Sequence, residues 1–165
     1  MTYSRFEELP VWQEAICLAD EVYNMTEHKD WSGSRSLRDQ LERAALSVSN
    51  NIAEGFERGT TNELLAFLYI ARGPAGEVRS MLCFLERLKG LANYNSQISN
   101  LKSLAESCWQ QLQTWADHLQ NSDIQGQRHL NEKTRSIYHS KKDAEKFQKE
   151  LLAALPSNHP LRRSE

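Results

Sequence analysis

The residue types that most often carry out catalysis occur in this chain, but their spacing builds no reactive site. None of the five histidines lies three or four residues from another, and none belongs to a Glu-x-x-His pair, so neither zinc nor di-iron ligation is predicted. The histidines are His28, His118, His129, His139 and His159. No glycine-rich phosphate loop follows a strand pattern, and no serine has a nameable base beside it. We therefore expect a protein that is not an enzyme and holds no metal or cofactor.

The cysteines also lack a reactive arrangement. Cys17, Cys83 and Cys108 are odd in number, never form a Cys-x-x-Cys pair, and each falls within an apolar helical pattern. We expect all three to be small, reduced core residues.

The sequence favours binding of a partner over catalysis, and the candidate binding residues lie within residues 37–58. Apolar residues recur there every three or four positions, as on the buried face of a helix. A polar row runs one position before them: Gln40, Arg43, Ser47, Asn51, Glu54 and Arg58. Ser and Asn are poor residues for a helix interior, so their hydrogen bonds are expected to matter. Such a helix can pack into its own core and also present polar groups to a second subunit.

A tight turn joins this helix to the next one, over residues 61–88. Thr60 followed by Glu63 forms a capping box, in which the Thr60 hydroxyl accepts a first-turn N–H and the carboxylate bonds back to the Thr60 backbone. Gly59 suits the end of the preceding helix. The two helices are therefore predicted to form an antiparallel hairpin in which facing residue numbers sum to about 120.

The hairpin register gives the polar row possible partners on the second helix. It places Arg43 opposite Glu77, and Arg72 near Ser47 and Asn51. Glu54 lies four residues before Arg58, which favours a helical ion pair. Two interpretations stay open: these groups satisfy one another at the bundle edge, or they meet another subunit.

The second helix of the hairpin carries two glycines and a proline in mid-course. Pro74 removes one helical hydrogen bond, so a kink is expected, but the apolar period keeps its phase and no break is predicted. Gly73 and Gly76 each cost about 1 kcal/mol relative to alanine in a helix interior. They indicate either close approach of another chain or a tolerated kink. The candidate interface therefore also includes Tyr69, Gly73, Gly76 and Glu77.

The rest of the chain completes an all-α fold. Helices are predicted over residues 10–26 and 96–120, and a turn-rich loop over residues 27–36 is expected to fold Trp31 back onto the bundle. With the hairpin, this gives an up-and-down antiparallel four-helix bundle over residues 1–120.

Residues 121–165 are predicted to form a polar C-terminal extension. They carry 9 Lys and Arg against 6 Asp and Glu, whereas residues 1–120 carry 11 against 16. A loop is expected over residues 121–139, followed by a short amphipathic helix that Ser140 caps and Pro156 ends. Its basic residues are Lys141, Lys142, Lys146 and Lys149. Such a helix can dock on its own bundle, enter a partner's groove or contact phosphates.

The whole chain has a formal net charge of −2, so any contact with nucleic acid must be local. No apolar run is long enough to cross a bilayer, and the first residues carry acids where a secretory signal would carry bases. We therefore expect a cytoplasmic protein with no membrane association.

Three segments resemble a known family: residues 8–23, 49–59 and 62–77. They are similar to the four-helix-bundle proteins encoded by intervening sequences of bacterial large-subunit ribosomal RNA genes, over roughly residues 6–120. The family's Ile-Ala-Glu-Gly-aromatic motif matches residues 52–56, and its Phe-Leu-Tyr-Ile-Ala-Arg-Gly motif matches residues 67–73. Two positions depart from the pattern. Glu42-Arg43 stands where many members have two arginines, and Pro74 stands where serine or leucine is common.

The resemblance implies a left-handed bundle that associates into rings, typically pentamers, with a link to ribosomal RNA. A more distant similarity, to accessory proteins of diversity-generating retroelements, implies contact with a reverse transcriptase and nucleic acid. Neither relative is an enzyme by itself.

These observations lead to two main functional hypotheses, and a third, an enzyme, would need an unexplained bound metal or cofactor to support it. The first is a non-catalytic homo-oligomer that associates with RNA or single-stranded DNA. Its phosphate contacts would be Arg43, Arg58, Arg72 and the tail lysines Lys141, Lys142, Lys146 and Lys149. The alternative is a scaffold or adaptor that recruits a reverse transcriptase or another protein encoded nearby, without touching nucleic acid.

Overall fold

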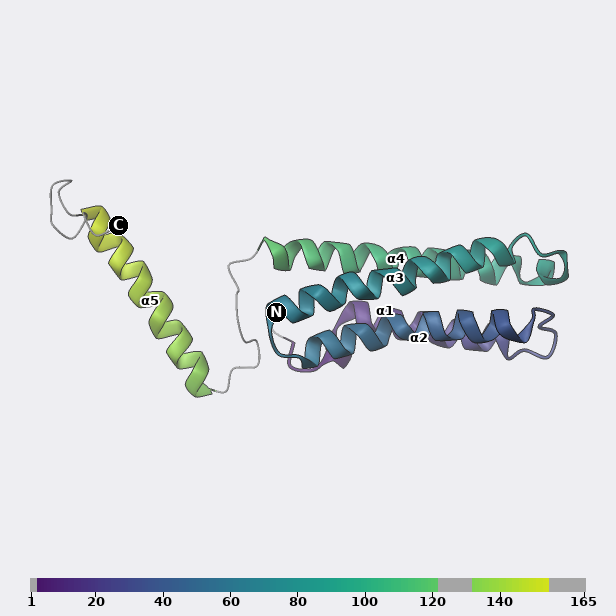
Figure 1. The fold of residues 1–165 in the computed structure, drawn as a ribbon, viewed down its shortest axis with the longest axis horizontal. Helices are drawn as coiled ribbons and strands as arrows, with labels where there is room; N and C mark the ends of the chain where they lie inside the picture. The colour runs from purple at the N-terminus through teal and green to yellow at the C-terminus, as the bar shows by residue number, and fades with distance from the viewer. Residues whose placement is uncertain (1–2, 122–131, 155–165) are drawn as a thin grey trace. The chain divides into compact units, whose positions relative to one another are not determined.

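The computed structural model describes residues 3–121 and 132–154 of the chain, and it is helical throughout its regular elements. Figure 1 shows their order along the chain. They are η1 (Phe6–Glu8), α1 (Pro10–Thr26), α2 (Arg35–Glu57), α3 (Thr61–Leu85), η2 (Lys89–Tyr94), α4 (Asn95–Gln120) and α5 (Glu132–Ala154). The predicted all-α class is confirmed.

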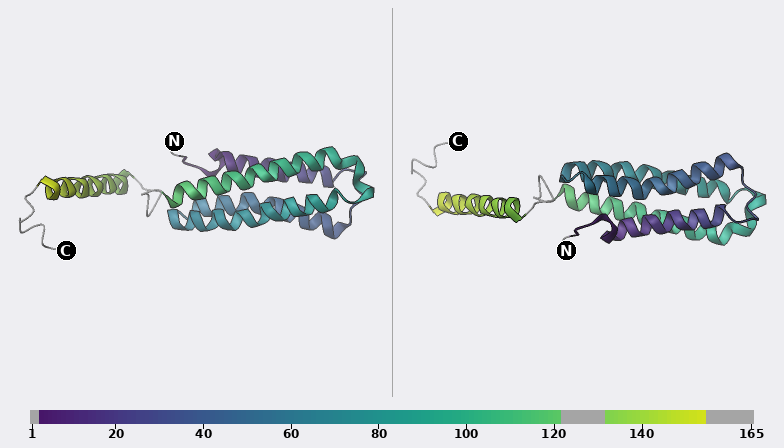
Figure 2. Two further views of the ribbon diagram at one scale, coloured as in Figure 1. Left: turned by 90° about the horizontal axis from the view of Figure 1, so that it is seen from above. Right: turned by 90° about the horizontal axis from the view of Figure 1, so that it is seen from below.

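Helices α1 to α4 form an up-and-down antiparallel bundle, as the two views of Figure 2 show. Each helix packs against two others, in the cyclic order α1, α2, α3, α4. One apolar cluster fills the centre, and leucines such as Leu18, Leu41, Leu68 and Leu112 are fully or almost fully buried in it. The apolar stripes of the four helices therefore meet along the bundle axis.

The helix ends are set by local capping. Ser34 accepts the Leu37 N–H at 3.2 Å, so α2 begins two residues earlier than predicted. Thr60 caps α3 by accepting the Glu63 N–H at 3.2 Å. The Glu63 carboxylate, however, accepts from the Thr60 hydroxyl at 2.7 Å instead of from its backbone. Gly59 has φ of 82°, a left-handed conformation that suits glycine where the chain leaves α2.

Pro74 does not break α3, which is continuous from Thr61 to Leu85. This confirms that the chain stays helical across the proline. The helix ends three residues before the predicted Leu88, and the 3-10 segment η2 leads into α4.

The loop before α2 folds back onto the end of the bundle, as predicted. Trp31 is half-buried and makes an edge contact with Tyr94, with ring centroids 5.9 Å apart. Ser32 Oγ donates to the Gly90 carbonyl at 2.7 Å. The loop is thereby tied to η2.

The prediction that all three cysteines lie in the core is wrong for two of them. Cys108 is buried, but Cys17 and Cys83 are exposed on the outer sides of their helices. Burial raises the pKa of the Cys108 thiol to about 12. All three cysteines fall within an apolar helical pattern, but that pattern alone does not show which of them lie at the centre of the buried face and which lie outside it.

The C-terminal helix is longer than predicted. Residues 132–139, expected to be a loop, are the first turns of α5, and Ser140 lies inside the helix instead of capping it. No glycine or proline interrupts residues 132–154, and a mid-helix serine costs only a few tenths of a kcal/mol (about 0.5). The helix-ending role predicted for Pro156 lies outside the described residues.

The chain divides into two compact units, one holding α1–α4 and the other α5. Among the described helices, none is long and apolar enough to cross a membrane.

Candidate interaction surface

The centre of the polar row on α2 is satisfied within its own helix. Asn51 Nδ2 donates to the Ser47 carbonyl at 2.7 Å and lies 3.1 Å from the Ser47 hydroxyl. Both side chains are half-buried, and Gln40, at the start of the row, is exposed. The hydrogen bonds expected for these poor helix formers therefore exist, and their partners are local.

The last two members of the row form the predicted helical ion pair. Arg58 Nη2 lies 2.6 Å from Glu54 Oε1, and the hydrogen bond to Glu54 raises the pKa of Arg58. The Arg58 guanidinium also lies over the ring of Phe67 from α3, 5.2 Å from its centroid. Because the pair is about half exposed, its contribution to stability is small.

The hairpin register is close to the predicted one, but one predicted ion pair is absent. Gly55 packs against Phe67 and Leu64, so facing residue numbers do sum to about 120. Arg43 and Glu77 are both exposed and make no ion pair with each other within residues 3–121. Arg43 Nε donates instead to the Asp39 carbonyl at 3.2 Å. Register fixes the level of a residue along the bundle but not the direction of its side chain.

The register alone predicts that Arg72 lies near residues 47–51 of α2, but its side chain is directed to α4. Its guanidinium lies over two aromatic rings, 4.8 Å from the centroid of Trp109 on α4 and 5.5 Å from that of Tyr69. Tyr69 is 41% exposed, and its hydroxyl donates to Gln120 Oε1 at 3.0 Å. Stacking of this kind holds the guanidinium plane while leaving its in-plane N–H groups for a ligand.

Arg72 differs from the other half-buried bases of α1–α4 in lacking an acid. Arg38 pairs with Glu42, Arg79 with Glu106, and Lys102 with Glu86. No hydrogen bond or ion pair is made by Arg72 among the described residues, and its buried Nε has no partner. A half-buried guanidinium without an anion is an unusual arrangement, because desolvation is then uncompensated.

The outer face of α3 is open and unusually apolar. Ile70 is 52% exposed and Phe84 is 51% exposed. A side chain added at Gly73 or Gly76 would touch nothing within 4 Å, so within this chain neither glycine is required by close packing. Ile70, Gly73, Glu77 and Phe84 recur at helical spacing and share this face.

One buried acid near the start of α2 was not singled out as a structural residue by sequence reasoning. Glu42 is 8% exposed and accepts hydrogen bonds from the Thr26 hydroxyl at 2.5 Å and from Arg38 Nε at 2.7 Å. The hydrogen bond from Arg38 raises the pKa of that guanidinium. The only available signal was the unusual acid in the Glu42-Arg43 pair.

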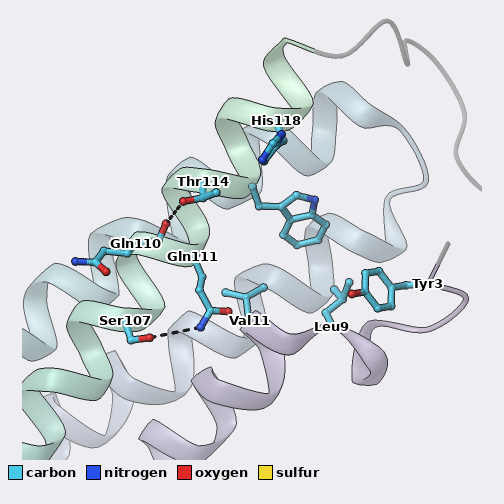
Figure 3. A pocket seen from close by; sticks show the side chains of 9 residues that line it. Tyr3, Leu9, Val11, Ser107, Gln110, Gln111, Thr114 and His118 are labelled. Carbon is cyan, nitrogen blue, oxygen red and sulfur yellow. Dashed lines mark hydrogen bonds between the residues drawn. The ribbon is translucent and has the colours of Figure 1, made fainter. Parts of the chain in front are cut away.

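A shallow hollow lies between the N-terminal segment and α4, and Figure 3 shows its lining. Tyr3, Leu9 and Val11 form one wall, and Ser107, Gln111 and other α4 side chains form the opposite wall. Ser107 and His118 lie three helical turns apart, about 16 Å along the axis, so they cannot act as a nucleophile and its base. The Thr114 hydroxyl, nearer to the histidine, donates to the Gln110 carbonyl at 2.9 Å. The hollow contains no arrangement suited to nucleophilic catalysis.

Helix α5 carries both basic and apolar side chains. Lys146 lies 3.9 Å from Glu150, and Lys149 is exposed. Phe147 is 66% exposed and Leu151 is 43% exposed. The side chains of Lys141 and Lys142 lie outside the described residues.

Comparison with known families agrees with the helical hairpin and its motifs. The family model for the 23S rRNA-intervening sequence protein matches residues 7–114, which include all of α1 to α3 and most of α4. The chain belongs to this family. A search of the curated proteins found no match. The family links the chain loosely to ribosomal RNA, and α5 lies beyond the matched region. In the part of the chain that the structure covers, no three His, Cys, Asp or Glu residues are grouped closely enough to bind a metal.

Proposed function

We propose that this family member is a non-catalytic bundle that assembles with copies of itself, as a ring of five, and acts in association with RNA. The observation that carries the proposal is the open face of α3, where Ile70 and Phe84 flank Gly73. Ile70 is 52% exposed, so covering it contributes about half of the 1.5–3 kcal/mol that full burial of an isoleucine gives, and a glycine without a side chain lets a second backbone approach.

Charge on the same side of the hairpin supports contact between copies. Arg43 and Glu77 are exposed, and the register sets them at the same level of the bundle without an ion pair between them. Where two copies meet, the exposed Glu77 carboxylate of one copy would offer a partner to the exposed Arg43 guanidinium of another. Opposite charges at the rim set the orientation of copies more than they add affinity.

Light scattering coupled to size exclusion tests self-association. The wild-type protein is expected to elute as a multiple of the 19.0 kDa chain, and Ile70→Glu as a monomer, because a carboxylate would be buried in the interface. Gln97→Glu, at an exposed position on α4, places the same charge away from the face and should leave the mass unchanged. A wild-type protein that is monomeric at all concentrations would contradict the proposal.

Titration of structured RNA against the protein tests the proposed association with RNA. Binding should weaken steeply between 50 and 200 mM salt, by ~10³-fold if six phosphates are neutralised, because each contact releases counterions. Absence of any binding at low salt would remove the RNA association and leave the oligomer.

An adaptor role without RNA contact is the second candidate, and the exposed Phe147 and Leu151 on α5 favour it. A partner helix that covers these residues would be recognised by their apolar spacing. Two results together would support this role: the wild-type protein binds a protein partner but no RNA, and the Phe147→Ser variant no longer binds that partner.

A further inference from the structure

We propose that Arg72 and Tyr69 form a binding site for one nucleotide of a single-stranded nucleic acid, with a phosphate on Arg72 and a base stacked on Tyr69. This inference rests on the proposed RNA association and names the form of RNA that the site accepts. It follows from two observations at neighbouring side chains: an unpaired cation and an exposed, restrained ring beside it.

The Arg72 guanidinium is held in position by aromatic rings, but no acidic side chain neutralises its charge among the described residues. Trp109 and Tyr69 hold the guanidinium at 4.8 and 5.5 Å from their ring centroids, whereas no acid contacts it among residues 3–121 and 132–154. Arg58 offers a comparison within the same molecule, because it also lies over a ring but pairs with Glu54 at 2.6 Å. A phosphate would supply to Arg72 the anion that Glu54 supplies to Arg58, through bidentate hydrogen bonds.

The ring beside the cation is suited to a base. Tyr69 is 41% exposed, and the hydrogen bond from its hydroxyl to Gln120 restrains the ring. Stacking on an aromatic side chain requires a base that is free of its own stack, which favours single-stranded over duplex nucleic acid. A carboxylate from a protein partner would satisfy Arg72 but would leave the Tyr69 ring exposed.

The test measures the affinity of the full chain for a short oligouridylate, for the same oligonucleotide with one abasic position, and for a duplex of equal length. Wild-type protein should bind the single strand in preference to the duplex. Tyr69→Ala should weaken binding about 5- to 100-fold and should no longer distinguish the intact strand from the abasic one. Tyr69→Phe keeps the ring and should bind nearly as the wild type does.

Arg72→Gln should lower the slope of log affinity against log salt by about one, because one phosphate contact is lost. Arg79→Gln is the matched control, since it makes the same change on the same helix at a cation that Glu106 already pairs. Thermal unfolding of each variant shows whether the bundle has remained folded.

The possible results separate the inference from the function on which it rests. Equal effects of Arg72→Gln and Arg79→Gln, or base discrimination that survives in Tyr69→Ala, would overturn the inference while RNA association stands. Equal binding of duplex and single strand would also overturn it. Loss of assembly in Arg72→Gln, with unchanged RNA binding, would assign the guanidinium to a carboxylate of another copy. No binding to any nucleic acid at low salt would overturn both the inference and the RNA association.

Discussion

At the scale of single residues, the glycines of the hairpin illustrate how neighbours change the meaning of a residue type. A side chain at Gly55 would overlap the Cβ of Phe67, which is fixed to the α3 backbone. A side chain at Gly76 would meet open space. Packing within the chain therefore requires glycine at the first position but not at the second.

We expect Gly55→Ala to lower the free energy of unfolding by about 1–3 kcal/mol, because overpacking outweighs the gain in helix propensity. Gly76→Ala should instead stabilise the isolated bundle by up to about 1 kcal/mol, because an added Cβ meets nothing within 4 Å there. Urea unfolding of both variants at low protein concentration measures the difference. A Gly55→Ala variant at least as stable as the wild type would show that α2 and α3 are not packed this closely.

The buried thiol gives a pH dependence whose direction can be stated. An unfolded cysteine loses its proton near 9.0, whereas burial holds the Cys108 pKa at about 12 in the folded chain. Unfolding therefore releases a proton between these pH values, and the stability contributed by the neutral thiol is complete below pH 9 and declines above it.

Cys108→Ala should flatten this decline, as measured by thermal unfolding between pH 8.5 and 10.5 against the wild type. In the native protein at pH 8, the exposed Cys17 and Cys83 should react readily with a thiol reagent and Cys108 should not. Rapid reaction of all three thiols in the folded state would contradict the burial of Cys108.

At the scale of elements, the turn between α2 and α3 decides how the hairpin is formed. Thr60 both caps α3 and donates to Glu63, and Gly59 turns the chain with a positive φ. These signals are local, because each one depends on residues fewer than five positions apart. For this reason the start of α3 could be predicted to within a residue.

Thr60→Ala should lower the free energy of unfolding by about 1 kcal/mol, since an N–H of the first turn of α3 loses its acceptor. Thr60→Ser keeps the hydroxyl and should retain most of the stability. Chemical denaturation of the two variants provides the comparison, and equal stability of the alanine and serine variants would mean that the cap contributes little.

The C-terminal element shows where local signals fail. Ser140 followed by Asp143 looks like a cap, yet α5 passes through it from Glu132. A serine that can cap is also tolerated in a helix interior, so the preceding residues decide which role it takes.

At the scale of the whole molecule, the bundle turns polar rows into distinct environments. Ser47 and Asn51 satisfy each other, Glu54 and Arg58 pair, and Arg72 is left stacked but without an acid. The exposed Ile70 and the stacked Arg72 both belong to α3, so assembly and RNA contact would lie on one helix. If both proposals hold, one face of the hairpin joins copies while the adjacent edge binds a strand.

The sequence by itself determined the all-α class, the hairpin, the capping of α3 and the family motifs. These features follow from helical periodicity and from contacts between residues close together in the chain. Such local signals do not depend on how the four helices pack. It also identified Arg72, Gly73 and Glu77 as residues of interest. It did not determine which neighbours they have.

Only the tertiary structure decided those neighbours. It turned Arg72 onto Trp109, separated Arg43 from Glu77, exposed Cys17 and Cys83, and buried Glu42 against Thr26. The physical reason is that side-chain direction depends on the rotation of each helix about its own axis. That rotation is set by how four apolar stripes fill one core together, and no single helix specifies it.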